Sequence, residues 1–327
     1  MFLLEELMDM YNGLITDVKG IELGHGTNEE AGTGCTVILC RRGAVGGVDV
    51  RGGAPGTRET DLLRPGHLVD RIHAIVLSGG SAFGLDTSCG VMKYLEEQDI
   101  GFDAGVAKIP IVCSAVLFDL AYKNASIRPD SNMGYQACQN ASHVLVDQGS
   151  VGAGTGATIG KVLGMEQAMK GGIGTASLKL PGGVIVGAVA AVNAFGDVVE
   201  PRTGVIIAGA KKPGTLDFLG TQAYLLSGNA TKGFAVENTT LVVVATNGRL
   251  TREQANKLSS VAHNGLALTI RPVHTMFDGD TVFTMATGYV DAEMTMLCTA
   301  AVEVVSRAVI NAVQFANLVS ANRVLEI

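Results

Sequence analysis

Charged residues are scarce in this sequence, and long basic runs are absent from it. Asp, Glu, Lys and Arg make up 17% of the 327 residues, whereas they make up about a quarter of an ordinary globular protein. Few surface charges are typical of a chain whose surface is partly hidden between subunits, so we expect a homo-oligomer. A net charge of −7 without a basic run excludes the positive surface that nucleic-acid binding requires.

Signals for export, membrane insertion and metal binding are also missing. The first ten residues are acidic and lack the basic start and small-residue cleavage site of a signal peptide. The longest apolar run, Val184–Val192, is about half the length needed to cross a bilayer. The six cysteines form no Cys-x-x-Cys pair, so we expect small buried hydrophobes rather than zinc ligands. We therefore expect a cytoplasmic protein that needs no membrane, metal or cofactor.

Glycine and hydrophobic residues are abundant instead. The chain has 43 glycines and is 47% hydrophobic, which is enough for one large core or two smaller ones. The glycines lie among Val, Ile and Ala runs, which indicates tight turns and close backbone packing. Strand-length apolar runs occur in both halves, with helical patterns between them. We therefore expect one α+β domain, residues 1–327, with sheets sandwiched between helices.

The expected elements follow from these runs and from turn signals. Strands are predicted at Ile15–Val18, Gly32–Cys40, Gly46–Val50, Ile72–Leu77, 204–210 and Leu266–Val273, with a hairpin over 172–199. Helices are predicted at Leu85–Glu97, Thr251–His263 and 292–319. Thr251 and Gln254 have the spacing of a capping box at the start of the second helix. Residues 211–232 are predicted to be a polar connection.

Two glycine-rich loops could suggest nucleotide binding, but both fail in detail. Ser78–Gly84 joins a strand to a helix and suits an anion or oxyanion, yet it is not Gly-x-Gly-x-x-Gly. The second loop is Gly149–Lys161, in which Thr155 takes the first glycine position of a P-loop. Val162 also replaces the Ser or Thr that should follow Lys161. Lys161 therefore ends a loop that we expect to be buried, and a buried lysine needs a partner.

Asn238 and Thr239 stand directly before the apolar run Leu241–Ala245. The simple interpretation is a loop that enters a buried strand. If the Asn238–Thr239 bond were cut, Thr239 would carry a hydroxyl and a free α-amine, which are a nucleophile and its base on one residue. Two other polar positions stay open at this point. Asn193 is either a turn residue or an inward-pointing amide, and the Asp-Gly pair at Asp278 is by default a surface turn.

Six motifs in one order resemble a known family. They are Leu23–Gly26, Gly52–Thr60, Leu77–Leu85, Gly152–Thr158, Asn238–Thr240 and Phe277–Asp280. Together they resemble the P1 or S58 peptidases, self-processing aminopeptidases of the DmpA and β-peptidyl aminopeptidase type that include the nylon-oligomer hydrolase. The resemblance runs from about Ile15 to the C-terminal helix. It implies an αββα sandwich of the N-terminal-nucleophile kind.

The resemblance also implies a cut and a set of site residues. The precursor would split at Asn238–Thr239 into an α-chain, 1–238, and a β-chain, 239–327. Thr239 matches the nucleophile of the family. The other catalytic positions match Lys161, Asn193, Asp278 and Asp280.

Each matched residue has an implied role. Asn193 would donate to the oxyanion, and Lys161 would lower the pKa of the Thr239 amine. The two aspartates would orient the amine and hydroxyl or bind the ammonium end of a substrate. Phe118 falls where some members have a tyrosine, so that hydroxyl is missing here. We expect Phe118 and Ser81 at substrate-binding positions.

The implied activity is hydrolysis of small amides through an acyl-Thr intermediate. Substrates would be short peptides or ω-amino-acid oligomers with a free amino end, and members of the family are typically tetramers. Two alternatives remain at this point. Acyl transfer to an amine is the outcome in ornithine acetyltransferases, which have a similar fold. A chain that is never cut would be a non-catalytic binding protein.

Overall fold

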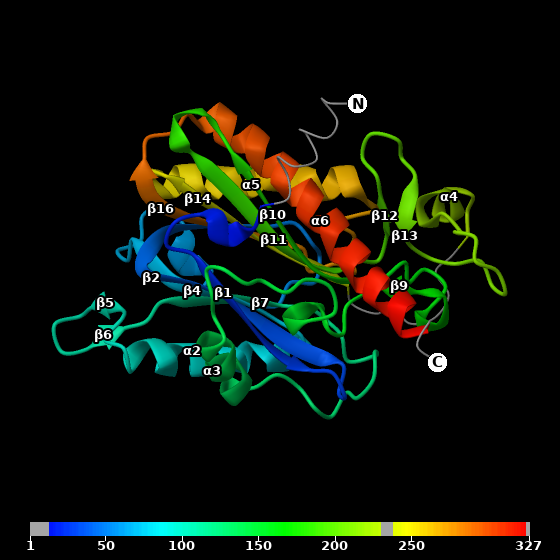
Figure 1. Ribbon diagram of the computed structural model, residues 1–327, viewed down its shortest axis with the longest axis horizontal. Coiled ribbons are helices and arrows are strands. Elements are labelled where there is room, and N and C mark those ends of the chain that lie inside the picture. Colours follow the sequence, from blue (N-terminus) through cyan, green and yellow to red (C-terminus); the bar gives the residue numbers. More distant parts are fainter. Residues whose placement is uncertain (1–12, 230–237, 325–327) are drawn as a thin grey trace.

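The structure, a computed structural model, describes residues 13–229 and 238–324, with side chains described as far as Leu318 in the last helix. Expectations for the first twelve residues and for 230–237 lie outside the described residues. Figure 1 shows helices above two sheet layers and further helices below them. The upper helices are α5 (Arg252–Thr269) and α6 (Met294–Val324). The lower ones are α2 (Thr87–Glu96) and α3 (Ser131–Gln139).

The two sheet layers are joined through one long strand, β2 (Thr33–Val50). Its second half pairs with β16 and belongs to the layer in the order β10–β11–β14–β16–β2. Its first half pairs with β1 and β4 and belongs to the other layer, which continues to β7 and β3. The register with β4 shifts between Leu39 and Ala44. The strands predicted at Gly32–Cys40 and Gly46–Val50 are therefore one strand that serves both layers.

The remaining strands have the following bounds. They are β1 (Glu22–Asn28), β3 (Thr57–Arg58), β4 (Arg71–Ser78), β5 (Phe102–Asp103), β6 (Lys108–Ile109), β7 (Val112–Val116), β8 (Thr158–Ile159), β9 (Met169–Lys170), β10 (Gly172–Lys179), β11 (Ile185–Asn193), β12 (Asp197–Val199), β13 (Ile206–Ala208), β14 (Thr239–Gly248), β15 (Ile270–Arg271) and β16 (Thr281–Val290). The short helices are η1 (Ile15–Asp17), η2 (Asp61–Leu63), η3 (Ser81–Asp86), η4 (Gly152–Gly154), η5 (Met165–Gln167), η6 (Pro181–Gly183) and α4 (Thr221–Leu226).

Strand β14 contributes side chains to two hydrophobic cores. Successive side chains of a strand point to opposite faces. Leu241, Val243 and Ala245 accordingly lie in the core between the sheets, with Ile75 of β4. Val242 and Val244 lie in the core beneath α5 and α6. A third core packs the other sheet layer against α2 and α3. The apolar run thus predicts a strand buried on both faces, which is confirmed.

Among the described helices, α6 alone is both long and apolar enough to pass a test for a membrane span. By length and hydropathy Met294–Leu318 could cross a bilayer, but two thirds of its most apolar window is buried within the protein. Val304, Val305 and Ala308 pack in the core shared with the sheet and α5. This is the burial expected of a core helix. The capping box of α5 is also present, since Thr251 Oγ1 accepts from Gln254 N and Gln254 Oε1 from Thr251 N.

Several expected elements are wrong. Ile15–Asp17 is a 3₁₀ turn rather than a strand, because Asp17 Oδ2 accepts from Leu14 N and closes the chain on itself. The first half of Leu266–Val273 is helix and only Ile270–Arg271 is strand: α5 continues to Thr269, because Ala262 and Leu266 extend the buried helical face. Helix α4 lies inside the predicted polar connection. Of the six cysteines, Cys89 is exposed and Cys298 half-buried, so only the other four fit the expectation.

Candidate active site

Several of the predicted site residues lie at the same end of three neighbouring strands, β11, β14 and β16. Strand β11 ends at Asn193, directly across the ladder from Thr239, the first residue of β14. Strand β16 runs parallel to β14 on its other side, and residues 278–280 come immediately before it. A bridge between Asn238 and Asp278 continues this pairing past the strand ends. Thr239 therefore lies between Asn193 on one neighbour and the 278–280 segment on the other.

Thr239 is buried against the carbonyl group that precedes it. Its Oγ1 donates to Asn238 O over 2.5 Å. The backbone N–H of Gly279 donates to the same oxygen over 2.7 Å, and Asn238 N donates to Phe277 O over 2.8 Å. The hydroxyl and a backbone donor thus meet at the carbonyl of the Asn238–Thr239 bond.

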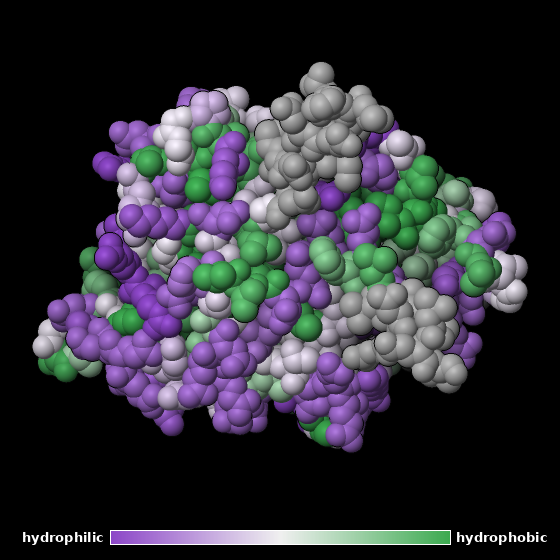
Figure 2. Space-filling view, viewed as in Figure 1, coloured by the Kyte–Doolittle hydropathy of each residue, from purple (hydrophilic) through white to green (hydrophobic). Residues whose placement is uncertain are grey.

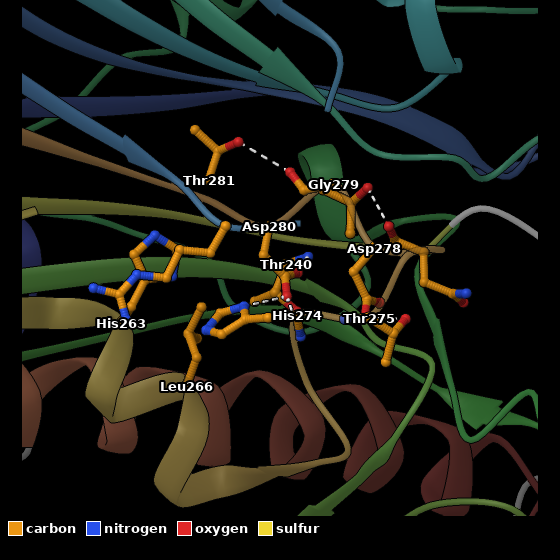
Figure 3. Close-up of polar contacts among 12 residues, drawn as sticks. Thr240, His263, Leu266, His274, Thr275, Asp278, Gly279, Asp280 and Thr281 are labelled. Atoms are coloured by element: carbon orange, nitrogen blue, oxygen red, sulfur yellow. Dashed lines mark hydrogen bonds and ion pairs between the residues drawn. The ribbon is translucent and has the colours of Figure 1, made fainter. Parts of the chain in front are cut away.

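The two aspartates are buried and hold backbone rather than the Thr239 hydroxyl. Asp280 Oδ1 accepts from Thr240 N over 2.6 Å, and its Oδ2 accepts from His274 N over 3.1 Å and bonds His274 Nδ1 over 2.8 Å. Asp278 Oδ2 accepts from Thr275 N over 2.6 Å and from Thr275 Oγ1 over 2.7 Å. Figure 3 shows His274 on one side of the Asp278–Asp280 segment and Thr275 on the other. The default surface turn is wrong here, because each carboxylate finds its donors inside the protein.

Asp278 carries a perturbed pKa. Burial, and then the neighbouring charge of Asp280, raise the pKa of Asp278 to about 6. The bonds from Thr275 and the charge of Lys161 oppose the rise. Two carboxylates close together in a buried place resist double ionisation.

Lys161 and Asn193 form a pair on the other side of Thr239. Lys161 Nζ donates to Asn193 Oδ1 over 2.7 Å and to Asn193 O over 3.2 Å. Thr158 N donates to the same Oδ1, and Asn193 Nδ2 donates to Phe118 O over 2.9 Å. Asn193 is therefore an inward-pointing amide rather than a turn residue. Burial lowers the pKa of Lys161 to about 7, although the charges of Asp278 and Asp119 oppose the fall.

A cavity of about 270 Å³ opens beside Thr239. Ser81 and Phe118, the two expected substrate positions, line it together with Thr239, and the remaining lining residues are Ala, Pro, Gly, Val and Leu. No residue of this lining carries a charge. The loop that bears Ser81 is held by Asp119, whose oxygens accept from Gly80 N over 2.7 Å and Thr33 Oγ1 over 2.6 Å. The cavity is therefore neutral, with a fixed wall.

Sequence reasoning missed His274, Asp119 and the role of Gly279. His274 has a positive φ of 59°, which is uncommon for residues other than Gly but enriched among Asn, Asp and His. Its ring packs edge-on against His263, with centroids 4.8 Å apart. Burial lowers the pKa of His263 to about 4, and its Nε2 bonds Asp49 O over 3.0 Å. An unexplained His four residues before Asp278 was the available signal.

Among the residues that the structure describes, no three or more His, Cys, Asp or Glu side chains are grouped so that they could hold a metal ion.

Comparison with known proteins covers almost the whole chain. The sequence profile described as peptidase family S58 matches residues 13–325. An uncharacterized aminopeptidase of Mycobacterium leprae (strain TN) is 43% identical over 302 residues, covering 86% of this chain and 80% of that protein. A 6-aminohexanoate-oligomer endohydrolase of Kocuria sp. (strain KY2) is 32% identical over 285 residues, covering 85% of this chain and 76% of that protein.

Solved structures give the fold. The L-aminopeptidase D-Ala-esterase/amidase from Ochrobactrum anthropi matches with a TM-score of 0.70 at 20% identity, over 93% of this chain and 86% of that one. A β-aminopeptidase from Burkholderia sp. matches with a TM-score of 0.64 at 24% identity, over 91% and 85% of the two chains. The first is described as a new variant of the Ntn hydrolase fold. The αββα sandwich expected from the sequence is confirmed.

Proposed function

The chain belongs to peptidase family S58, hydrolases of peptide or linear amide bonds, and we propose that it cuts its own Asn238–Thr239 bond and then uses Thr239 on small amides. One observation carries the proposal. Thr239 Oγ1 lies 2.5 Å from the oxygen of the carbonyl it would attack, and Gly279 N donates to that oxygen over 2.7 Å. Proximity of the nucleophile to the amide carbonyl is one requirement of such a cut, and Oγ1 then has to turn from the carbonyl oxygen to the carbonyl carbon.

Maturation proceeds by transfer of the acyl group within Thr239. Its Oγ bonds to the Asn238 carbonyl carbon, the C–N bond breaks, and the leaving nitrogen gains a proton to become the α-amine. Water then hydrolyses the resulting ester and leaves a carboxylate on Asn238. The α-amine is still part of the amide before the cut, so it cannot act as base. Lys161, with its pKa lowered to about 7, is the proposed proton acceptor of this step.

Turnover repeats the attack on a bound substrate. The free α-amine of Thr239, with an ordinary pKa of about 8, takes the hydroxyl proton as Oγ bonds to the substrate carbonyl. Asn193 Nδ2 turns from Phe118 O to the developing oxyanion, while Lys161 holds its Oδ1. The leaving amine departs with the proton, and water releases the acyl group from Thr239. The chains 1–238 and 239–327 stay together.

The neutral cavity favours an uncharged acyl chain of modest size. Its volume of about 270 Å³ suits a short aliphatic segment, and its lining carries no carboxylate for an ammonium group. Relatives named aminopeptidase and 6-aminohexanoate-oligomer endohydrolase support amides of short peptides or ω-amino acids with a free amino end. In this arrangement the aliphatic segment next to the cut amide occupies the cavity, and the amino end lies beyond it.

Exposed hydrophobic side chains support assembly into a homo-oligomer, for which a tetramer is expected. Val205, Leu216 and Leu226 are well over half exposed, and Figure 2 shows hydrophobic surface over the β13–α4 end. Apolar surface gathered in one place marks interaction sites. Light scattering coupled to size exclusion tests this, and a monomer across the micromolar range contradicts it.

The decisive test is a denaturing gel of purified protein with N-terminal sequencing of each band. We expect a second chain that begins Thr-Thr-Leu-Val, and a Thr239→Ala variant that stays whole while unfolding at a similar temperature. Processed protein should hydrolyse a 6-aminohexanoate oligomer or a short peptide amide, and the uncut variant should not. A wild-type chain that stays intact after long incubation overturns the proposal.

A further inference from the structure

The carbonyl of the Asn238–Thr239 bond already has a hydrogen-bond donor in place. Gly279 N donates to Asn238 O over 2.7 Å. This donor comes from the 278–280 segment, whereas the attacking Oγ1 belongs to Thr239 at the start of β14. When Oγ1 bonds to the carbonyl carbon, negative charge develops on this oxygen. A fixed donor aimed at such a charge stabilises the transition state.

The donor is held rigidly because its neighbours have their own partners. Asp278 O accepts from Ala54 N over 2.8 Å and Asp280 O from Arg51 N over 3.0 Å. Gly279 O accepts from Thr281 Oγ1 over 2.9 Å, a bond drawn in Figure 3. With the carboxylates bound to Thr275, Thr240 and His274, the whole 278–280 segment is fixed before the reaction. Preorganisation of this kind is the source of a donor's catalytic effect.

Glycine at position 279 allows neighbouring atoms to approach closely and is not needed for the backbone conformation. Its φ lies outside the left-handed region, so the conformation itself does not require glycine. A Cβ there would stand 2.7 Å from Thr239 Oγ1 and 2.7 Å from Ala54 O. Contacts this short cannot persist, so a side chain would displace the nucleophile or the donor. An ordinary ladder bond between strands makes no such demand.

Asn193 does not serve this carbonyl in the uncut chain. Its Nδ2 donates to Phe118 O, and its Oδ1 accepts from Lys161 Nζ and Thr158 N. The amide that we assign to the substrate oxyanion is therefore engaged elsewhere during maturation.

We propose, on the basis of the self-cleavage set out above, that the backbone N–H of Gly279 is the oxyanion donor of the maturation step, separate from the Asn193 amide used in turnover. Thr239 Oγ bonds to the Asn238 carbon, and the oxyanion is held by Gly279 N–H. Collapse breaks the C–N bond, and the hydroxyl proton passes by way of Lys161 to the leaving nitrogen.

The test removes this N–H and leaves every side chain unchanged. Glycolic acid inserted at position 279 during cell-free translation replaces the amide by an ester without adding a side chain. We expect the rate of maturation, read from the β-chain band over time, to fall about 100- to 1000-fold. The matched control is the same ester at Gly149, whose N–H also donates over 2.7 Å to a backbone carbonyl, Ile173 O, in an isolated bridge, here an antiparallel one. Its maturation should stay within threefold of the wild type.

Two readings separate the possible failures. If the wild-type chain in the same translation is not cut, the proposed function fails. If the wild type is cut and the 279 ester matures at the same rate, only the Gly279 inference is overturned. If the 279 ester matures slowly, it is incubated until part of it is cut, and its hydrolysis of substrate is measured per cut chain. Turnover within threefold of wild type supports a donor dedicated to maturation, and a parallel loss of turnover overturns it.

Discussion

The two sides of Thr239 are built from different chemistry. On the β11 side, a buried lysine and an amide bond each other, and burial lowers the pKa of Lys161 to about 7. On the β16 side, Asp278 and Asp280 are also buried, but their oxygens bind the N–H groups of Thr275, Thr240 and His274. The pKa of Asp278 is also shifted, to about 6, so each side has a group that titrates near neutral pH. The second side in addition fixes backbone through its carboxylates.

This difference divides the work of the site. A proton acceptor needs a pKa close to the working pH, and Lys161 meets that condition. A donor to an oxyanion needs a fixed position, and the clamped 278–280 segment provides one. Both oxygens of Asp280 and Oδ2 of Asp278 accept hydrogen bonds from neighbouring groups. Substitutions on the two sides should therefore change different properties of the reaction.

The largest effect is expected from Lys161→Met. Loss of the proton acceptor of the maturation step should slow maturation by about 100- to 10,000-fold, measured as the rate of band splitting. The matched control is Lys170→Met. Lys170 is half-buried, its pKa is also lowered to about 7, and its Nζ donates to Thr155 O rather than to Asn193. Equal losses in both variants would mean that burying any lysine here, rather than proton transfer, is what matters.

Gly279→Ala tests the crowded side. The new Cβ would approach Thr239 Oγ1 and Ala54 O to 2.7 Å, so maturation should slow by at least about 100-fold, the size of a lost oxyanion donor. Gly248→Ala, at the far end of β14, is the control, since its Cβ would come no closer than 3.1 Å to Ala292 Cβ. A Gly279→Ala chain that matures at the wild-type rate would show that the close approach has no role.

The pH dependence of the maturation rate tests the role of Lys161, on the β11 side of Thr239. The neutral fraction of a group with a pKa of about 7 rises about tenfold between pH 6 and pH 8. Maturation should therefore speed up about tenfold over this range and then level off, because neutral Lys161 is the active form. The rate is measured by stopping samples in acid at intervals. A rate that falls as the pH rises would assign the proton the opposite role.

Substitutions of His274 test how the backbone is fixed on the β16 side of Thr239. Its Nδ1 and N both bond Asp280 Oδ2, and its φ is 59°. Asn tolerates this φ and can place a nitrogen near the Nδ1 position. His274→Asn should mature within threefold of wild type, whereas His274→Ala should slow maturation by about tenfold, the effect of one lost hydrogen bond. If Asn fails to rescue what Ala loses, His274 does not act by positioning Asp280.

How far the sequence predicts this molecule differs between the sheet and the site. Leu241–Ala245 predicts β14 because an unbroken apolar run suits a strand buried on both faces. The end of α5 was missed, because Leu266–Ile270 fits a helix and a strand equally well until its neighbours are known. The closeness of Asn193 to Thr239 came only from the resemblance, since 46 residues separate them in the chain. The His274–Asp280 bond depends on a positive φ that no residue pattern announces.

The smallest expected effect is on stability. The lowered pKa of Lys161 determines whether stability rises or falls with pH. Below pH 7 both the folded and unfolded states protonate Lys161, and the folded state bears the full cost of a buried ammonium. Between about 7 and the unperturbed value of 10.5, only the unfolded state keeps the proton, so wild-type stability rises with pH.

Lys161→Met should therefore raise the free energy of unfolding at pH 6 by on the order of 1–4 kcal/mol more than it does near pH 10. Asn193 Oδ1 keeps its bond from Thr158 N in this variant, so its remaining loss is the same at both pH values and cancels in the comparison. Urea unfolding at the two pH values measures the difference. An equal change at both would mean that Lys161 is not held near neutrality by burial, and the division between the two sides of Thr239 would lose its basis.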